Sequence, residues 1–231
     1  MGLQGEIVEY LKANGACLCG FAGLGPTGGG FASWPRAVSF AVPLAPGVVA
    51  EILRGPTPEY LAEYRRANAL IDRLAAGVSA LLSGRGFRAF AVSATTSEYD
   101  ADTLSSGFSH KTAATLAGLG WIGRCALLVT REFGSAVRLG TVVTDAELPD
   151  GKPVTESMCG DCTRCVEACP GGAPSGREWK QGLPRDAFFD AHACRDAARR
   201  LSAERLGEAM SVCGICISVC RFTQRYVEGA R

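Results

Sequence analysis

Apolar positions in the N-terminal two thirds of the chain predict a body of helices and strands. In residues 4–13, Ile7 and Leu11 recur at helical spacing, which predicts a short amphipathic helix. A longer apolar stripe, repeating every three or four residues, predicts a helix of about seven turns from Thr57 to Gly84. Proline in its first turn, preceded by threonine, marks where this helix begins.

Five short runs of apolar or alternating residues predict β-strands, each bounded by glycine, proline or a polar turn. These runs are residues 16–23, 37–44, 88–94, 126–130 and 135–144. A further helix is expected to begin at His110 and to end at Gly118. The letters from Gly23 to Gly28 match a dinucleotide-binding fingerprint, but glycines and a proline follow instead of a helix. A loop is therefore expected there.

A linker rich in turn residues, 145–157, separates this body from a cysteine-rich C-terminal part. Two domains are therefore predicted, one over residues 1–150 and one over residues 151–231. Hydrophobic residues make up 47% of the chain, which is enough for a sizeable core in the larger domain.

Charge and terminal sequence exclude several classes of protein. The formal net charge is +1, which argues against an extended nucleic-acid-binding surface. The first residues lack the basic and then apolar pattern of a signal peptide. The longest uncharged stretch, 13–35, is rich in glycine and unsuited to cross a membrane. A reducing cytoplasmic location with no membrane association is expected.

Cysteine spacing carries the clearest chemical signal in the chain. The run from Cys159 to Pro170 reads C-x2-C-x2-C-x3-C-P, which is the spacing of bacterial two-cluster ferredoxins. Three cysteines of such a run hold one [4Fe–4S] cube, and the fourth ligates the other cube. The further cysteines that a second cube requires are present downstream, at positions 194, 213, 216 and 220.

This crossing rule divides eight cysteines between two clusters. The first cluster is expected on Cys159, Cys162, Cys165 and Cys220. The second cluster is expected on Cys169, Cys194, Cys213 and Cys216. Zinc fits less well because its sites close at four ligands and often use histidine, and the chain has two histidines in all. A disulfide framework also fits less well, because it is typical of small secreted chains and the first residues lack a signal-peptide pattern.

Three cysteines lie outside these motifs. Cys17 and Cys19 fall on a predicted strand and are expected to be unligated core residues, since free cysteine is often buried. Cys125 begins another predicted strand and is expected to be packed and unligated, with a place near a cofactor pocket as the alternative.

The run Ala117-Gly-Leu-Gly-Trp-Ile-Gly123, combined with both cysteine motifs, resembles epoxyqueuosine reductase and its relatives. Those cobalamin-dependent enzymes carry two [4Fe–4S] clusters and share this design with the respiratory reductive dehalogenases. The resemblance is strongest over residues 110–220 and identifies the chain as a short form of the family. It implies an α+β fold, in which a nitroreductase-like α/β layer domain is followed by a ferredoxin-like two-cluster module.

The resemblance implies a reductase in which electrons pass from a ferredoxin or flavodoxin through the two clusters to a bound cobalamin. The reduced cobalt would act on a small-molecule or protein-bound substrate that the sequence does not name. The alternative is an electron-transfer or reductive-activator protein that binds no corrinoid of its own. A homodimer or a partner protein would help to enclose a corrinoid in so short a chain.

Site residues follow from the same resemblance. Ungapped alignment places Leu104 where the family has an acidic proton donor, and a shift of two residues makes Asp102 the candidate catalytic acid. The expected cofactor-binding residues are His110, Lys111, Gly118, Gly120 and Trp121. His110 is read either as a solvated helix-cap residue or as a corrin contact. Trp121 is read either as a wall for a flat cofactor or as a core residue.

A tRNA substrate is not expected at this stage. The C-terminal helical repeats with which the family grips tRNA have no counterpart in the residues after Cys220. The near-neutral charge also offers little general attraction for a polyanion.

Overall fold

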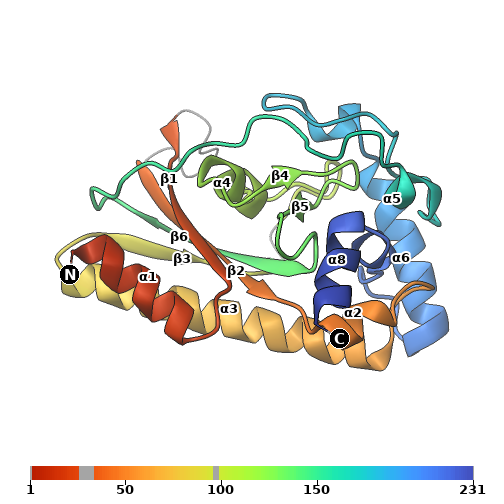
Figure 1. Ribbon diagram of the computed structural model, residues 1–231, viewed down its shortest axis with the longest axis horizontal. Coiled ribbons are helices and arrows are strands. Elements are labelled where there is room, and N and C mark those ends of the chain that lie inside the picture. The colour runs from red at the N-terminus through yellow and green to blue at the C-terminus, as the bar shows by residue number, and fades with distance from the viewer. Residues whose placement is uncertain (1, 26–33, 96–98, 231) are drawn as a thin grey trace. The chain divides into compact units, whose positions relative to one another are not determined.

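The computed structural model describes residues 2–25, 34–95 and 99–230 (Figure 1). The chain forms two compact units, each built from separate stretches of sequence. The sheet unit comprises Met1–Pro43, Arg66–Leu119 and Arg138–Val154. The cluster unit comprises Leu44–Arg65, Gly120–Val137 and Thr155–Arg231. The predicted boundary between residues 150 and 151 stays a prediction, because these units describe packing and not which pieces fold alone.

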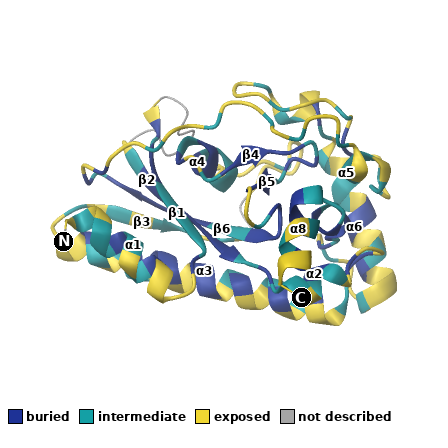
Figure 2. Cartoon of the chain, viewed as in Figure 1, coloured by how far each residue is buried: buried dark blue, intermediate teal, exposed yellow. Residues whose placement is uncertain are grey.

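A four-stranded sheet with the order β1-β2-β6-β3 forms the sheet unit. Its strands are β1 (Leu18–Gly23), β2 (Arg36–Pro43), β6 (Val137–Thr144) and β3 (Ala89–Val92). β1 pairs antiparallel with β2, and β3 pairs antiparallel with β6. Every position of β2 except its two ends is buried (Figure 2), as expected of a strand covered on both faces of a sheet.

Helices cover both faces of this sheet (Figure 1). On one face lies α3 (Pro58–Gly84), where Ile71 is so close to Gly140 that an added Cβ would meet it at 2.8 Å. On the other face α4 (His110–Leu116) packs on β1 and β2. Gly20 of β1 permits this approach, because a Cβ there would meet the carbonyl oxygen of Ala117 at 2.7 Å. α1 (Leu3–Ala13) buries Ile7 and Leu11.

The cluster unit contains a two-stranded sheet of β4 (Trp121–Ile122) and β5 (Leu128–Val129) and several short helices. The helices are α2 (Pro46–Ala50), α5 (Arg164–Glu167), the 3₁₀ helix η2 (Arg185–Ala187), α6 (Ala191–Leu206), α7 (Ile215–Ser218) and α8 (Arg221–Gly229). α6 is the longest of them, capped by Asp190, whose Oδ1 accepts from the N–H of Ala193 at 2.9 Å. It ends at Gly207, which has φ of +77°.

The predicted helices over 4–13, 57–84 and 110–118 are confirmed, as are four of the five predicted strands. The strand predicted over 126–130 is shorter than expected and lies outside the main sheet. Only Leu128 and Val129 are extended, and they pair with β4. Ala126 has φ of +57°, a left-handed conformation that interrupts an extended run. Half of the dinucleotide-like motif, residues 26–28, lies outside the described residues.

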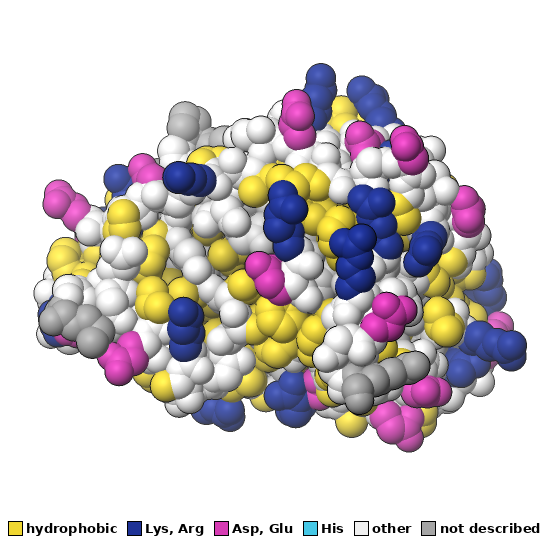
Figure 3. All heavy atoms as spheres, in the orientation of Figure 1, with side chains coloured by type: hydrophobic (Ala, Val, Ile, Leu, Met, Phe, Trp, Pro, Cys, Tyr) yellow, Lys and Arg dark blue, Asp and Glu magenta, His cyan; other side chains and the backbone are white. Residues whose placement is uncertain are grey.

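Charge and hydropathy on the molecule agree with the sequence. None of the helices in the described ranges is both long enough and apolar enough to span a membrane. Acidic and basic side chains are both present on the face shown in Figure 3, in keeping with the net charge of +1. Several Lys and Arg side chains nevertheless gather near one another on that face.

Candidate metal centre

A cavity in the cluster unit gathers the four cysteines expected for the first cluster. Its lining includes the thiols of Cys159, Cys162, Cys165 and Cys220. The wall is completed by Gly123, Arg124, Cys125, Val129, Arg221 and Phe222. Four soft sulfur donors around an otherwise largely apolar space fit a [4Fe–4S] cube. The chemistry of the donor set therefore agrees with the crossed assignment of Cys220 to the first group.

Local turns bring these cysteines together. The N–H of Cys162 donates to the carbonyl of Cys159 at 3.3 Å, which closes a tight turn. Gly160 permits this turn with φ of +54°. The single-turn helix α5 then carries Cys165, and Cys220 is the N-cap residue of α8. Cys165 and Cys220 thus lie at the start of a helix, and the turn from Cys159 leads into α5.

The second group shows a matching turn. Gly214, with φ of +89°, follows Cys213 just as Gly160 follows Cys159. Burial raises the pKa of the Cys213 thiol, and the neighbouring Cys169 raises it further. This proximity accords with the expected sharing of one cluster by Cys169 and Cys213. In the described part of the chain, no three metal-ligating side chains converge closely enough for a single ion. A [4Fe–4S] cube binds each cysteine through a different iron atom.

Cys125 lies between the two groups of cysteines. Its buried thiol contacts both Cys165 and Cys216, which are expected to ligate different clusters. The hydrogen bond with Cys165 lowers the pKa of Cys125, but the contact with Cys216 and complete burial outweigh it and raise that pKa well above its ordinary value. Cys125 is thus packed, as expected, and also lies in the wall of the first-cluster cavity.

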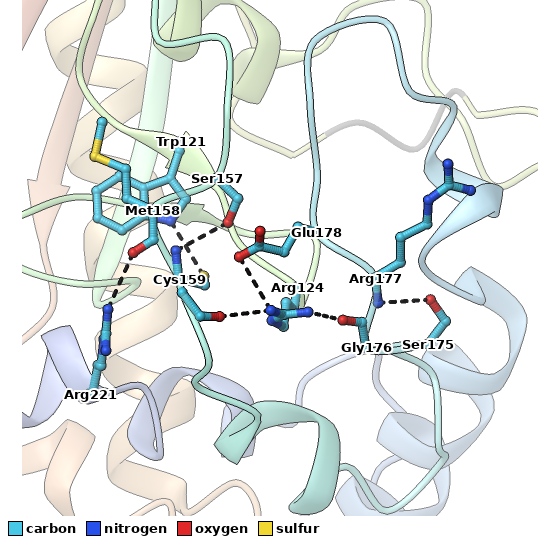
Figure 4. Close-up of polar contacts among 11 residues, drawn as sticks. Trp121, Arg124, Ser157, Met158, Cys159, Ser175, Gly176, Arg177, Glu178 and Arg221 are labelled. Atoms are coloured by element: carbon cyan, nitrogen blue, oxygen red, sulfur yellow. Dashed lines mark hydrogen bonds and ion pairs between the residues drawn. The ribbon is translucent and has the colours of Figure 1, made fainter.

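Trp121 contacts a cysteine that is expected to ligate the first cluster. Its Nε1–H donates to Sγ of Cys159 at 3.4 Å (Figure 4), and its side chain is almost fully buried. The indole also meets the ring of Phe222 edge to face, with 5.0 Å between centroids. Of the two readings of Trp121, the structure therefore favours a core residue, although one that contacts a metal ligand.

Two arginines in the cavity wall were missed by sequence reasoning. Arg124 donates through Nη2 to the carbonyl of Gly160 at 2.7 Å and pairs with Glu178 at 3.2 Å (Figure 4). Arg221 donates through Nη2 to the carbonyl of Met158 at 3.3 Å. The sequence could have pointed to both arginines, because each is next in the chain to a cysteine of the cavity wall.

His110 lies in the sheet unit and is held at both ring nitrogens. Nε2 lies 3.0 Å from the carbonyl oxygen of Ser93, and Nδ1 lies 2.9 Å from Oγ1 of Thr141. A carbonyl oxygen only accepts, so Nε2 carries the proton. Burial lowers the pKa of His110, which favours this neutral form. The reading of His110 as a solvated cap is wrong, because Ser109 caps α4 instead.

The other predicted site residues are divided between the units. Gly118 has φ of +79°, and a Cβ there would meet the carbonyl of Lys152 at 2.6 Å. Gly120, in the cluster unit, packs directly on the backbone of Val129. Asp102 is exposed in a turn of the sheet unit, and Lys111 is half-buried in the first turn of α4.

Two cysteines and one histidine have no predicted metal role. Cys17 and Cys19 are half-buried on or beside β1, so they are less enclosed than the core positions expected for them. Burial nevertheless raises the pKa of the Cys19 thiol. His192 is exposed at the start of α6.

Residues 158–223 match the family model of the 4Fe-4S double cluster binding domain. The chain is therefore an iron–sulfur protein that binds two [4Fe–4S] clusters, as the cysteine spacing predicted.

Similarity extends beyond this domain. The chain is 33% identical over 141 residues to the epoxyqueuosine reductase of Synechocystis sp., a match that covers 57% of this chain and 45% of that protein. The chain thus spans about half the length of this relative. Its sequence is similar to those of epoxyqueuosine reductases, as its motifs indicated.

Two solved structures share the fold at 18% identity. One is a catabolic reductive dehalogenase in complex with 3-bromo-4-hydroxybenzoic acid, with a TM-score of 0.73 over 94% of this chain and 31% of that chain. The other is an epoxyqueuosine reductase with an epoxyqueuosine-modified tRNA stem loop, with a TM-score of 0.64 over 96% of this chain and 65% of that chain. The expected mixture of helices and sheet is confirmed.

These comparisons correct the expectation that tRNA is not a partner. The relatives are named epoxyqueuosine reductases, and one matching structure holds a modified tRNA stem loop. Net charge was a poor guide because it sums over the whole chain, whereas Lys and Arg side chains gather locally on the face in Figure 3.

Proposed function

We propose that this chain is an iron–sulfur oxidoreductase that passes electrons through its two clusters to a bound corrinoid. One observation carries this proposal. Residues 120–125 include part of the run that resembles the reductase family. Trp121 donates to Cys159, and residues 123–125 line the first-cluster cavity. The most family-like part of the body thereby adjoins the electron-carrying centre.

The proposed substrate is epoxyqueuosine in tRNA. Support comes from the names of the relatives and from the tRNA stem loop in a structure with the same fold. A bound corrinoid would supply a strongly reducing cobalt centre, and the reduction of an epoxide also requires a proton donor. Asp102, exposed in its turn, is the proposed donor, and Lys111 is a proposed corrinoid contact.

The sheet unit is the proposed corrinoid-binding body. Its four-stranded sheet, covered by α3 on one face and α4 on the other, supports the proposed likeness to nitroreductase-type layers. His110, Gly118 and Gly120 are proposed to act through packing, because the imidazole is saturated with hydrogen bonds and both glycines press against backbone. The proposed compartment is the reducing cytoplasm, which keeps cluster thiols available.

A second candidate is an electron-transfer or reductive-activator protein without a corrinoid of its own. One observation favours it. The Trp121 side chain is buried and donates to Cys159, instead of facing an open cofactor site. Under this alternative the two clusters would deliver electrons to another protein.

Anaerobic addition of cobalamin to the cluster-loaded protein separates the two. Tight binding of about one corrinoid per chain, with the visible spectrum of the base-off form, is expected for the reductase. Unchanged corrinoid spectra with both clusters intact and reducible would leave the electron carrier. Dithionite-driven conversion of an epoxyqueuosine-modified tRNA stem loop then tests the substrate. Asp102→Asn should slow this conversion without loss of corrinoid, and Asp186→Asn, at an exposed position of η2, serves as a matched control.

A further inference from the structure

Arg124 and Arg221 both line the first-cluster cavity. In each side chain the Nε atom is buried and has no hydrogen-bond acceptor among the described residues. A buried donor without an acceptor costs about 1–3 kcal/mol. Two such donors in one cavity wall therefore indicate that the natural occupant of the cavity accepts hydrogen bonds. The sulfides of a [4Fe–4S] cluster and its thiolate ligands are acceptors of this kind.

Arg124 is fixed so that its Nε remains available. Nη2 contacts the carbonyl of Gly160 at 2.7 Å and Glu178 at 3.2 Å, and Nη1 donates to the carbonyl of Gly176. The far end of the guanidinium is thus committed to the protein. Its side chain is only 13% exposed, so water screens its charge weakly. The positive charge of Arg124 also acts on the thiol of Cys165.

Arg221 is fixed in a similar way from another element. Nη2 donates to the carbonyl of Met158 at 3.3 Å, and the guanidinium lies 4.9 Å from the ring centroid of Phe222. Figure 4 shows Arg221 and Arg124 on either side of Cys159. Two cations, held by separate parts of the cluster unit, therefore flank the same group of ligands.

At two cysteines of the second group, Cys169 and Cys213, the donors are backbone N–H groups, which are neutral. The backbone N–H of Ala173 donates to Sγ of Cys169 at 3.4 Å, and the backbone N–H of Ile215 acts on Cys213. A cluster held by four thiolates is an anion, and reduction by one electron adds negative charge to it. Nearby cations and charge-assisted hydrogen bonds favour the reduced form more than neutral donors do.

We propose that Arg124 and Arg221 donate hydrogen bonds through Nε to the first cluster and hold its reduction potential above that of the second. With both clusters bound, an electron entering at the second cluster would favour transfer to the first. The second cluster would be oxidised by one electron and the first reduced by one electron, with no proton exchanged. This inference rests on cluster binding alone and is independent of the proposed substrate and corrinoid.

The first test compares two arginines that share one aromatic neighbour. Arg221→Gln removes a cation from the cavity wall, whereas Arg225→Gln removes an exposed arginine that also faces Phe222, at 5.5 Å, but does not line the cavity. Potentials are read from redox titrations followed by electron paramagnetic resonance, at matched iron content. Arg221→Gln should shift the reduction equilibrium of the higher-potential cluster about tenfold toward the oxidised form. For a one-electron couple this lowers its reduction potential by about 59 mV. Equal potentials in the two variants would overturn the proposal.

The second test needs no substitution and therefore holds even if a variant loses a cluster. The protein is prepared with arginine labelled with ¹⁵N in the guanidinium group only, and pulsed electron paramagnetic resonance is recorded as each cluster is reduced. Coupling to an arginine nitrogen is expected on the cluster that is reduced first. Coupling confined to the cluster that is reduced second, or no coupling on either, would refute the assignment.

Discussion

The indole N–H of Trp121 donates to Sγ of Cys159 across 3.4 Å, which joins the glycine-rich run to the first cysteine of the cluster motif. These residues are far apart in sequence, and both belong to the cluster unit. A hydrogen bond to a cluster thiolate withdraws negative charge from the sulfur and favours the reduced cluster. Trp121 therefore contributes to the electronic environment of the first cluster as well as to its packing.

Replacement of Trp121 by Phe should lower the reduction potential of the first cluster. The variant keeps an aromatic ring against Phe222 but removes the N–H that Cys159 accepts. A loss of about 1 kcal/mol in the free energy of unfolding is expected beside the redox effect. The matched control is Trp34→Phe in the sheet unit, which should leave both cluster potentials unchanged. A potential in Trp121→Phe equal to that of the wild type would contradict this role.

Anaerobic reconstitution should yield about eight iron atoms and about eight acid-labile sulfides per chain. Cys213→Ser should lose the cluster that also uses Cys169 and retain signals of the other. Cys17→Ser removes a cysteine outside both motifs and should keep the full iron content. Iron analysis that returns about four atoms or fewer for the wild type would contradict the two-cluster assignment.

Cys125 should prove to be a packed thiol and not a ligand. Cys125→Ser conserves size while it replaces the sulfur that contacts Cys165 and Cys216. Iron and sulfide content should be unchanged. Cys125→Ala should in addition lower the free energy of unfolding by about 1 kcal/mol because it leaves a small cavity. Loss of iron from the serine variant would instead show that Cys125 binds a cluster.

The sheet unit should become less stable as the pH is lowered, because of His110. Burial lowers the pKa of folded His110 below the ordinary value of about 6.5, so the unfolded chain takes up the proton first. The free energy of unfolding is therefore retained above about pH 6.5 and declines as the pH drops below it. Urea unfolding between about pH 7 and pH 5 measures this slope.

His110→Gln should remove this part of the slope, while His192→Gln, at an exposed histidine, should keep it. The pKa of Asp145 is lowered by its hydrogen bond with Arg88, but that contribution is lost only as the pH falls below about 4. The two windows are therefore separable. An unchanged slope in His110→Gln would rule out this histidine as the source.

Local sequence determined most of the helices and strands of the sheet unit. Ile7 and Leu11, and the long stripe through Ile71, recur at helical spacing, and such periodicity depends on near neighbours alone. It also predicted the candidate ligands, because the C-x2-C-x2-C run supplies three ligands of one cluster from a few residues, although the fourth, Cys220, comes from a distant motif. The short helices α5 and α7 have no comparable periodic signal, since each is a single turn set by the cysteine motif.

Only the tertiary structure decided the surroundings of the ligands and of His110. It placed His110 between Ser93 and Thr141, where burial favours its neutral form. It also placed Arg124 and Arg221 in one cavity wall, although 97 positions separate them in sequence. The physical reason is that a ligand motif acts over a few residues, whereas burial, charge and hydrogen bonding around a cluster come from packing between segments that no local pattern specifies.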